Sequence, residues 1–234
     1  MQLFYNPDIS KDDLQIEFSK EESRHIVKVL RKSVGDILQI TNGNGWLFSA
    51  EIITNNQKSC KAEIISTEKQ KSRDYYLHLA VAPTKMNDRY EWFLEKSTEI
   101  GIDEITPIIC DNSERRVIKK NRFERVLQSA LKQSLNCYLP KLNEAITLQE
   151  FFEKDIVGNK FIAHCEERER TSLKKELKSS ENVTLLIGPE GDFSISEIDL
   201  ALNNDFKPIT LGESRLRTET AAIVACSSVA FINH

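Results

Sequence analysis

The pattern of apolar and polar positions changes character near residue 70. Before this point the apolar runs are short and rich in β-forming residues. Residues 36–41 and 46–53 flank Asn42-Gly43-Asn44-Gly45, which predicts a β-hairpin. Residues 61–65 can add another strand. These elements predict a small β-barrel domain over residues 1–70.

One helix is predicted ahead of the hairpin. Over residues 23–32, Ile26, Val27 and Leu30 fall on one face and the basic residues lie outside it. Residues 66–74 are polar and show no periodicity, so we expect a linker there.

Beyond the linker, continuous apolar runs alternate with helical spacing. Near-continuous apolar runs are typical of strands that are buried on both faces. The predicted strands are residues 76–82, 105–109, 161–163, 183–187 and 208–211. A helix over Tyr90–Ile100 ends at Gly101, a second is capped by Asn121 with Glu124, and the last covers residues 218–232. This alternation predicts an α/β fold with a mainly parallel sheet over residues 74–234.

Composition narrows the class of protein. The five cysteines are widely spaced and form no C-x-x-C pair, so neither a disulfide framework nor a zinc site is expected, and we predict no metal. No apolar run reaches the roughly 20 residues that a membrane span needs. The first residues also lack the pattern of a secretory signal. We therefore predict a cytoplasmic protein that does not enter a membrane.

The net charge of −4 argues against a nucleic-acid partner, but its distribution argues for one. Basic residues outnumber acidic ones over residues 24–36 and 113–132. A locally basic surface on an acidic protein can bind phosphates. Two solvated charged surfaces would explain the same pattern and are the commoner case.

The first segment that suggests chemistry is residues 186–197. A buried strand runs into the turn Gly188-Pro189-Glu190-Gly191 and then into a helix, where Ser194 and Glu197 have capping-box spacing. Glycines permit a ligand to approach the backbone, and open α/β sheets bind ligands at the ends of parallel strands. A plain turn between strand and helix also fits, and the Gly-Lys-Ser/Thr ending of a P-loop is missing.

The second segment is residues 211–222. Arg215 and Arg217 precede an almost entirely apolar helix, for which Thr218 is a suitable cap and Glu219 suits the positive end. Two arginines entering a buried helix suggest an anionic or polar partner.

Read together, these motifs resemble those of RsmE-type SPOUT methyltransferases. The paired signatures are Ile187–Gly191 and Leu211–Ala221. Upstream, the similar motifs are His25…Val29-Leu30-Arg31…Gly35-Asp36, Lys85…Asp88-Arg89…Glu91-Trp92…Gly101, Ser113-Glu114-Arg115 and Gln133-Ser134…Pro140. The resemblance covers nearly the whole chain. It is more specific than any single motif, because these patterns occur in the right order.

The resemblance implies a fold, a reaction and a cofactor. It implies a PUA-like β-barrel RNA-binding domain followed by a SPOUT domain with a deep trefoil knot, an exception to the rule against knotted chains. The expected activity is methylation of N3 of a uridine in 16S rRNA of the small ribosomal subunit, by a homodimer that uses S-adenosylmethionine. The expected cofactor-binding residues are Leu186, Ile187, Gly188, Pro189, Glu190, Gly191, Leu211, Gly212, Leu216, Arg217, Thr218, Thr220 and Ala221.

Catalytic and RNA-binding roles are also expected. Arg217 or Arg115 would stabilise negative charge on the uracil oxygens, and Glu219 or Glu190 would accept the proton or orient the base. The expected RNA contacts are Arg24, Lys28, Arg31, Arg89 and Arg115. His78 and His164 lie beside predicted strands and are assigned no role.

Some positions depart from the family pattern, and other readings stay open. Lys132–Asn136 lacks the arginine that is common in the family, and Asp192 stands where many relatives have glycine.

A SPOUT enzyme with another RNA target, or an RNA-binding protein that has lost its cofactor, would share this fold. An ordinary doubly wound nucleotide-binding enzyme is disfavoured because the G-x-G-x-x-G turn is missing.

Overall fold

The protein is described by a computed structural model that covers residues 2–233 and contains two compact units. The first unit runs to Ser72 and also contains Leu131–Leu139; the second contains Arg73–Ala130 and the residues from Pro140 onward. Residues 131–139 belong to the first unit because the turn of its hairpin binds them. Gly45 N donates to the Cys137 carbonyl (2.7 Å), and Leu139 N donates to the Gly43 carbonyl (2.8 Å). The predicted division at residues 70–74 did not assign residues 131–139 to the first unit.

The first unit is built on a five-stranded sheet with the order β1-β3-β4-β5-β2. Its strands are β1 (Leu3–Tyr5), β2 (Gln15–Glu17), β3 (Ile37–Thr41), β4 (Trp46–Thr54) and β5 (Lys61–Lys69). The predicted hairpin is confirmed, because β3 and β4 pair antiparallel around the Asn-Gly turn. Phe4, Phe18, Ile26 and Phe48 lie in its buried core.

Two predictions for this unit need correction. The predicted helix over residues 23–32 begins earlier, as α1 (Lys20–Arg24), because Ser19 caps it, and it continues as the π-helix η1 (His25–Val29). The predicted linker begins too early, since residues 66–69 still belong to β5 and pair with residues 46–49 of β4. Both faces of this part of β5 are exposed, so its side chains are polar and show no alternation of apolar and polar residues. The sequence pattern therefore did not indicate a strand there.

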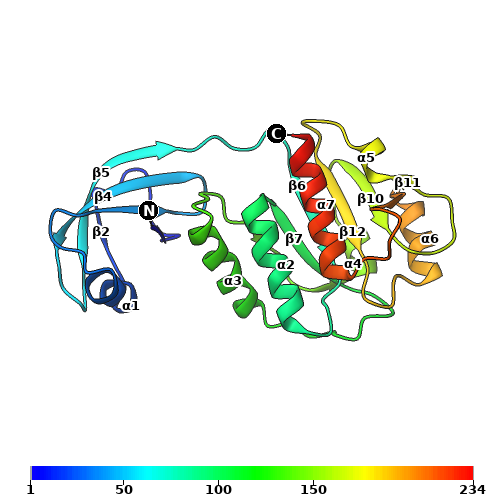
Figure 1. The fold of residues 1–234 in the computed structure, drawn as a ribbon, viewed down its shortest axis with the longest axis horizontal. Helices are drawn as coiled ribbons and strands as arrows, with labels where there is room; N and C mark the ends of the chain where they lie inside the picture. The colour runs from blue at the N-terminus through cyan, green and yellow to red at the C-terminus, as the bar shows by residue number, and fades with distance from the viewer. Residues whose placement is uncertain (1, 234) are drawn as a thin grey trace. The chain divides into compact units, whose positions relative to one another are not determined.

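The second unit contains an eight-stranded sheet whose hydrogen-bonded order is β11-β13-β10-β12-β6-β7-β8, with β9 also pairing to β7 (Figure 1). Every pair in it is parallel. The strands are β6 (Leu77–Val81), β7 (Glu104–Ile109), β8 (Lys141–Leu142), β9 (Ile146–Thr147), β10 (Asn159–Ala163), β11 (Thr171–Ser172), β12 (Val183–Ile187) and β13 (Lys207–Thr210). The helices are α2 (Asn87–Ile100), α3 (Lys120–Gln133), α4 (Leu148–Phe152), α5 (Leu173–Glu176), α6 (Ile195–Asn203) and α7 (Thr218–Ile232).

Helices cover both faces of this sheet. Helices α2 and α7 lie side by side, and α7 packs on β6 and β12 (Figure 1). Phe151 of α4 and Ile198 of α6 form a separate core with Ala80, Ile162 and Leu186 of the sheet. Burial on both faces explains why these strands read as continuous apolar runs.

Three local expectations are settled by this unit. The predicted strand over residues 105–109 is irregular at Pro107, because the residues before it pair with β8 and those after it pair with β9. Asn121 does not cap α3, since that helix already begins at Lys120. Thr218 is not a cap either: Arg217 is the N-cap residue, and the Thr218 side chain bonds to a neighbouring turn instead. None of the helices in residues 2–233 is long and apolar enough to cross a membrane.

Candidate functional site

A cavity of about 550 Å³ lies at the carboxyl ends of three neighbouring strands, β10, β12 and β13. Its walls are the loops that follow these strands, together with the first turns of α7. Strand β10 pairs with β12 on one side and with β13 on the other, so its end forms the middle of the site. This is the position at which open parallel sheets bind ligands.

The turn after β12 is held close to the loop after β10. A side chain at Gly188 would be crowded, because a Cβ there would lie 3.0 Å from the Phe193 ring and 3.2 Å from its backbone nitrogen. Asp192 has a left-handed backbone (φ 64°), and its carboxylate accepts a hydrogen bond of 2.6 Å from Cys165 N. The turn then enters α6 through the predicted capping box of Ser194 and Glu197, which is confirmed.

The loop after β13 closes the cavity from the other side. The Thr218 hydroxyl, at the start of α7, donates a 3.0 Å hydrogen bond to the Gly188 carbonyl and so joins the two predicted motifs. Arg215 and Arg217 both line the cavity and are exposed. The positive end of α7 and two guanidinium groups therefore add positive charge to this wall, which also carries the carboxylate of Glu213.

Glu190 extends from the cavity to the segment after β6. Its Oε1 accepts a 3.0 Å hydrogen bond from Lys85 N, while its Oε2 is buried and has no partner among residues 2–233. Arg115 supports the same segment, since its guanidinium donates to the carbonyl oxygens of Thr84 (3.1 Å) and Lys85 (2.6 Å). Arg115 does not line the cavity; it holds the backbone that orients Glu190.

Glu219 also lies away from the cavity lining. Its side chain is 8% exposed, and its Oε1 lies 3.8 Å from Arg89 Nε. The second oxygen, Oε2, is buried and has no hydrogen-bond partner in the described part of the chain. Arg89, which was predicted to contact RNA, is thus the ion-pair partner of a buried carboxylate.

His164 follows β10 at the middle of the site. It is 4% exposed, and its Nδ1 and Nε2 are both buried without a hydrogen-bond partner within residues 2–233. Burial lowers the pKa of His164, and the nearby Arg170 lowers it further. Sequence reasoning assigned this residue no role, although it directly follows a predicted strand.

Most of the predicted cofactor-binding residues line the cavity. Those that do are Ile187, Gly188, Pro189, Glu190, Leu211, Gly212, Leu216, Arg217, Thr218 and Ala221. Leu186, Gly191 and Thr220 are not among the lining residues. Leu186 is fully buried in β12 and packs into the core on the α4 and α6 side. Gly191 instead approaches Asn112, which donates to the Gly191 carbonyl.

Sequence reasoning missed one wall and part of another. The lining residues outside the predicted cofactor-binding set are Ala163, His164, Cys165, Arg170, Asp192, Ile209, Thr210, Glu213, Ser214 and Arg215. Of these, Arg215 was already expected to have an anionic or polar partner. The end of β10 could have been included by its place after a predicted parallel strand. The local pattern does not show, however, that β10 pairs between β12 and β13.

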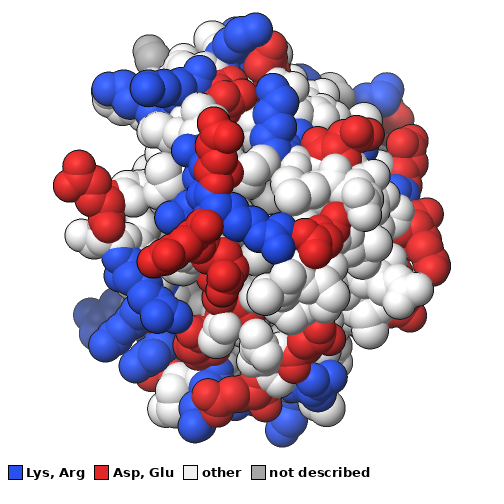
Figure 2. Space-filling view, turned by 90° about the vertical axis from the view of Figure 1, so that its right-hand side faces the viewer, with Lys and Arg blue, Asp and Glu red and all other residues white. Residues whose placement is uncertain are grey.

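The predicted RNA-binding residues fall into two sets. Arg24, Lys28 and Arg31 are exposed on and after α1 and η1 of the first unit, whereas Arg89 and Arg115 lie in the second unit. On the face shown in Figure 2, basic and acidic side chains are mixed and no large area of one sign is visible. No group of three or more His, Cys, Asp or Glu side chains within residues 2–233 is arranged to hold a metal ion.

Comparison with known proteins places the chain in a family. The model of an RNA methyltransferase domain matches residues 71–230, and that of an RNA methyltransferase PUA domain matches residues 18–66. Ribosomal RNA small subunit methyltransferase E of Rickettsia conorii is 31% identical over 223 residues, which cover 93% of this chain and 90% of that protein. The chain belongs to the ribosomal RNA small subunit methyltransferase E family. The fold class implied by the RsmE-type resemblance is thereby confirmed in both parts, while the trefoil knot stays a prediction.

Solved structures of similar proteins agree with this family. A probable rRNA-methyltransferase of Porphyromonas gingivalis is 42% identical, with a TM-score of 0.92 over 100% of this chain and 98% of its own. A Legionella pneumophila methyltransferase, solved with the bound cofactor SAM, is 29% identical, with a TM-score of 0.87 over 99% of this chain and 97% of its own.

Proposed function

We propose that this chain transfers the methyl group of S-adenosylmethionine to N3 of one uridine in 16S rRNA of the small ribosomal subunit. The observation that carries the proposal is the cavity where the two family motifs meet, joined by the bond from Thr218 to Gly188. Family membership supports the reaction, and the bound SAM of the Legionella relative supports the cofactor.

The residues of the cavity suit this cofactor. Gly188, Pro189 and Leu211 offer glycine backbone and apolar side chains to a flat adenine ring. Glu190 Oε2 and the two His164 ring nitrogens are buried polar atoms without a hydrogen-bond partner among residues 2–233. The cofactor has polar groups at several positions, which can supply these hydrogen bonds. When bound, S-adenosylmethionine supplies an activated methyl group on a sulfonium with a good leaving group.

The protein must then position the uracil and handle the proton of N3. Arg217 is exposed at the cavity and can donate hydrogen bonds to the uracil oxygens, on which negative charge develops as the proton leaves. Glu190 is the candidate proton acceptor, since it lines the cavity and one of its carboxylate oxygens is buried without a partner among residues 2–233. Glu219 also has a buried oxygen of this kind, but it lies outside the cavity lining. Arg115 acts through Glu190 by fixing the Thr84–Lys85 backbone.

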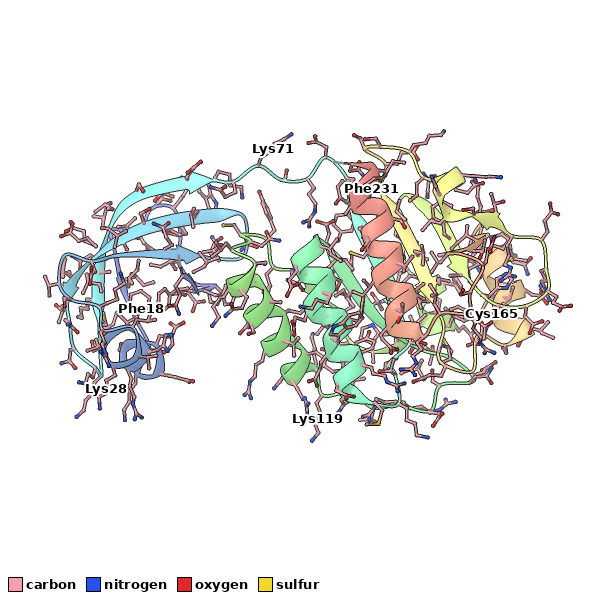
Figure 3. The ribbon with its side chains drawn as sticks, in the orientation of Figure 1. Phe18, Lys28, Lys71, Lys119, Cys165 and Phe231 are labelled. Atoms are coloured by element: carbon pink, nitrogen blue, oxygen red, sulfur yellow. The ribbon has the colours of Figure 1, made fainter. Side chains whose placement is uncertain are left out.

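The proposed partners are the RNA and a second copy of the chain. The first unit would bind RNA through phosphate contacts of Arg24, Lys28 and Arg31, which are exposed and close in sequence. A homodimer is supported by α7, whose Phe231, near the end of the helix (Figure 3), is 87% exposed. We propose that the protein acts in the cytoplasm, where such a substrate is found.

The test is methyl transfer from labelled S-adenosylmethionine to small ribosomal subunits from a strain that lacks this enzyme, followed by nucleoside mass analysis. We expect N3-methyluridine at a single site. Cofactor binding without transfer to these subunits would contradict the proposed target. Absence of both cofactor binding and methyl transfer would contradict the proposal that this chain is an enzyme.

A further inference from the structure

His164 is unusual among the described residues because it is a buried polar side chain with no polar contact. Both ring nitrogens are buried and unpartnered, and the residue borders the cavity at the end of β10. Its backbone carbonyl is engaged, since Arg170 Nη1 donates to it, so the position of the main chain is fixed. The ring is therefore held at the site without a partner of its own.

An unsatisfied buried polar group costs free energy, so it calls for a physical explanation. His78 of the same sheet shows the ordinary solution, because its Nε2 lies 2.7 Å from the Thr106 hydroxyl. A neutral imidazole has one donor and one acceptor, and both are unused in His164. A ligand that enters the cavity with polar groups would satisfy them.

We propose that His164 is a binding residue for the methyl donor: its neutral ring hydrogen-bonds to a polar group of S-adenosylmethionine. The inference rests on the proposed function of the cavity. The neutral state matters because the donor carries a sulfonium charge, which a protonated imidazole in the same cavity would repel.

Some of the charges around His164 favour its neutral state and others favour its protonated state. Arg170 and Arg168 disfavour protonation of the ring, while Asp192 and Glu166 favour it, and burial outweighs these charges to keep the pKa below 6.5. The charged residues that also line the cavity from the other two loops are Glu190, Glu213, Arg215 and Arg217.

The first test compares affinity with stability in three variants of the full chain. In His164→Leu we expect S-adenosylmethionine to bind about tenfold more weakly by calorimetry, because the bonds to the ring are lost. The thermal stability of the ligand-free protein should stay equal or rise, because the replaced side chain had no partner. His164→Gln keeps a donor and an acceptor and should bind closer to the unaltered protein.

His78→Leu is the matched control, since it removes the half-buried histidine of β6, which does have a partner. It should lower thermal stability and leave affinity unchanged. The inference is overturned if His164→Leu binds S-adenosylmethionine normally, or if it loses stability without ligand as His78→Leu does. Failure of the unaltered protein to bind would overturn the proposed function, and the inference with it.

The second test uses pH and the demethylated product, S-adenosylhomocysteine, whose sulfur is uncharged. Affinity of the unaltered protein for S-adenosylmethionine should fall as the pH drops below 6.5, and more steeply than affinity for the product. His164→Gln should lose this difference between the two ligands. The same pH dependence for both ligands would overturn the requirement for a neutral ring.

Discussion

The hydroxyl of Thr218 donates a 3.0 Å hydrogen bond to the carbonyl oxygen of Gly188. These residues lie 30 positions apart in two different motifs, and their bond holds the first turn of α7 against the turn after β12. Thr218 is 5% exposed, so water cannot easily replace the bond. The cavity therefore depends on a contact within the protein for its shape.

Replacement of Thr218 tests this dependence. Thr218→Val keeps the shape but leaves the Gly188 carbonyl without its partner, which should cost about 1–3 kcal/mol of unfolding free energy. Chemical denaturation measures this loss, and calorimetry should show weaker binding of S-adenosylmethionine. Thr218→Ser retains the hydroxyl and should recover most of both; equal losses in Ser and Val would show that the hydroxyl is unimportant.

Arg217 should contribute to turnover rather than to folding. Because it is exposed, Arg217→Ala should leave thermal stability nearly unchanged. Loss of its hydrogen bonds to the uracil oxygens should reduce kcat about 100-fold in the methyl-transfer assay. Arg217→Lys keeps the charge but not the paired donors and should recover only part of the rate. An undiminished rate in the alanine variant removes Arg217 from the mechanism.

Lys28 tests the RNA contacts of the first unit. Lys28→Ala removes an exposed charge and should weaken RNA binding evenly across sequences. The slope of log affinity against log salt should become shallower by about 1. Lys58→Ala is the control, because Lys58 is exposed in the same unit but outside the predicted basic segment. Equal effects of the two variants would indicate general charge attraction only.

Phe231 tests the proposed homodimer. Phe231→Glu places a charge on the exposed face of α7 and should convert the dimer to monomers in sedimentation velocity, with little change in the fold of each copy. Val117→Glu is the control, because Val117 is 78% exposed but lies outside α7. A dimer that survives the change at Phe231 places the interface elsewhere.

Stability should decrease in acid because of two groups near the start of the sheet strands. Burial lowers the pKa of His78 to about 4, so the unfolded chain binds its proton more readily than the folded one. The contribution of His78 is present above pH 6.5 and is lost as the pH falls toward 4. Chemical denaturation at several pH values should show this loss, and His78→Gln should reduce it in that window.

Glu104 should extend the decrease to lower pH. Burial alone would raise its pKa, but hydrogen bonds from Asn143, Tyr76 and Lys141 outweigh burial and hold the pKa at about 2. Its contribution is therefore present above about pH 4.5 and is lost as the pH falls toward 2. Glu104→Gln should flatten the plot of unfolding free energy against pH in this lower window. It should not weaken the pH dependence between 6.5 and 4.5, because the charge of Glu104 raises the pKa of His78 and its removal lowers that pKa further.

Local pattern in the sequence determined much of the secondary structure. The strand over residues 183–187 and the helix over residues 218–232 begin and end as predicted. The hairpin around Gly43 and the capping box at Ser194 were also predicted correctly. These features depend on neighbours a few residues apart, and spacing reports such neighbours directly.

Only the tertiary structure decided which distant residues meet. The order of strands brings His164 to the middle of a site whose two known motifs lie on either side. Arg89 and Arg115 were both expected to contact RNA. In the structure Arg89 pairs with Glu219, and Arg115 donates a hydrogen bond to the Lys85 carbonyl. The sequence places a charged or polar residue on an element, but pairing between elements determines its partner. That pairing arises from contacts across the sheet, which no local periodicity records.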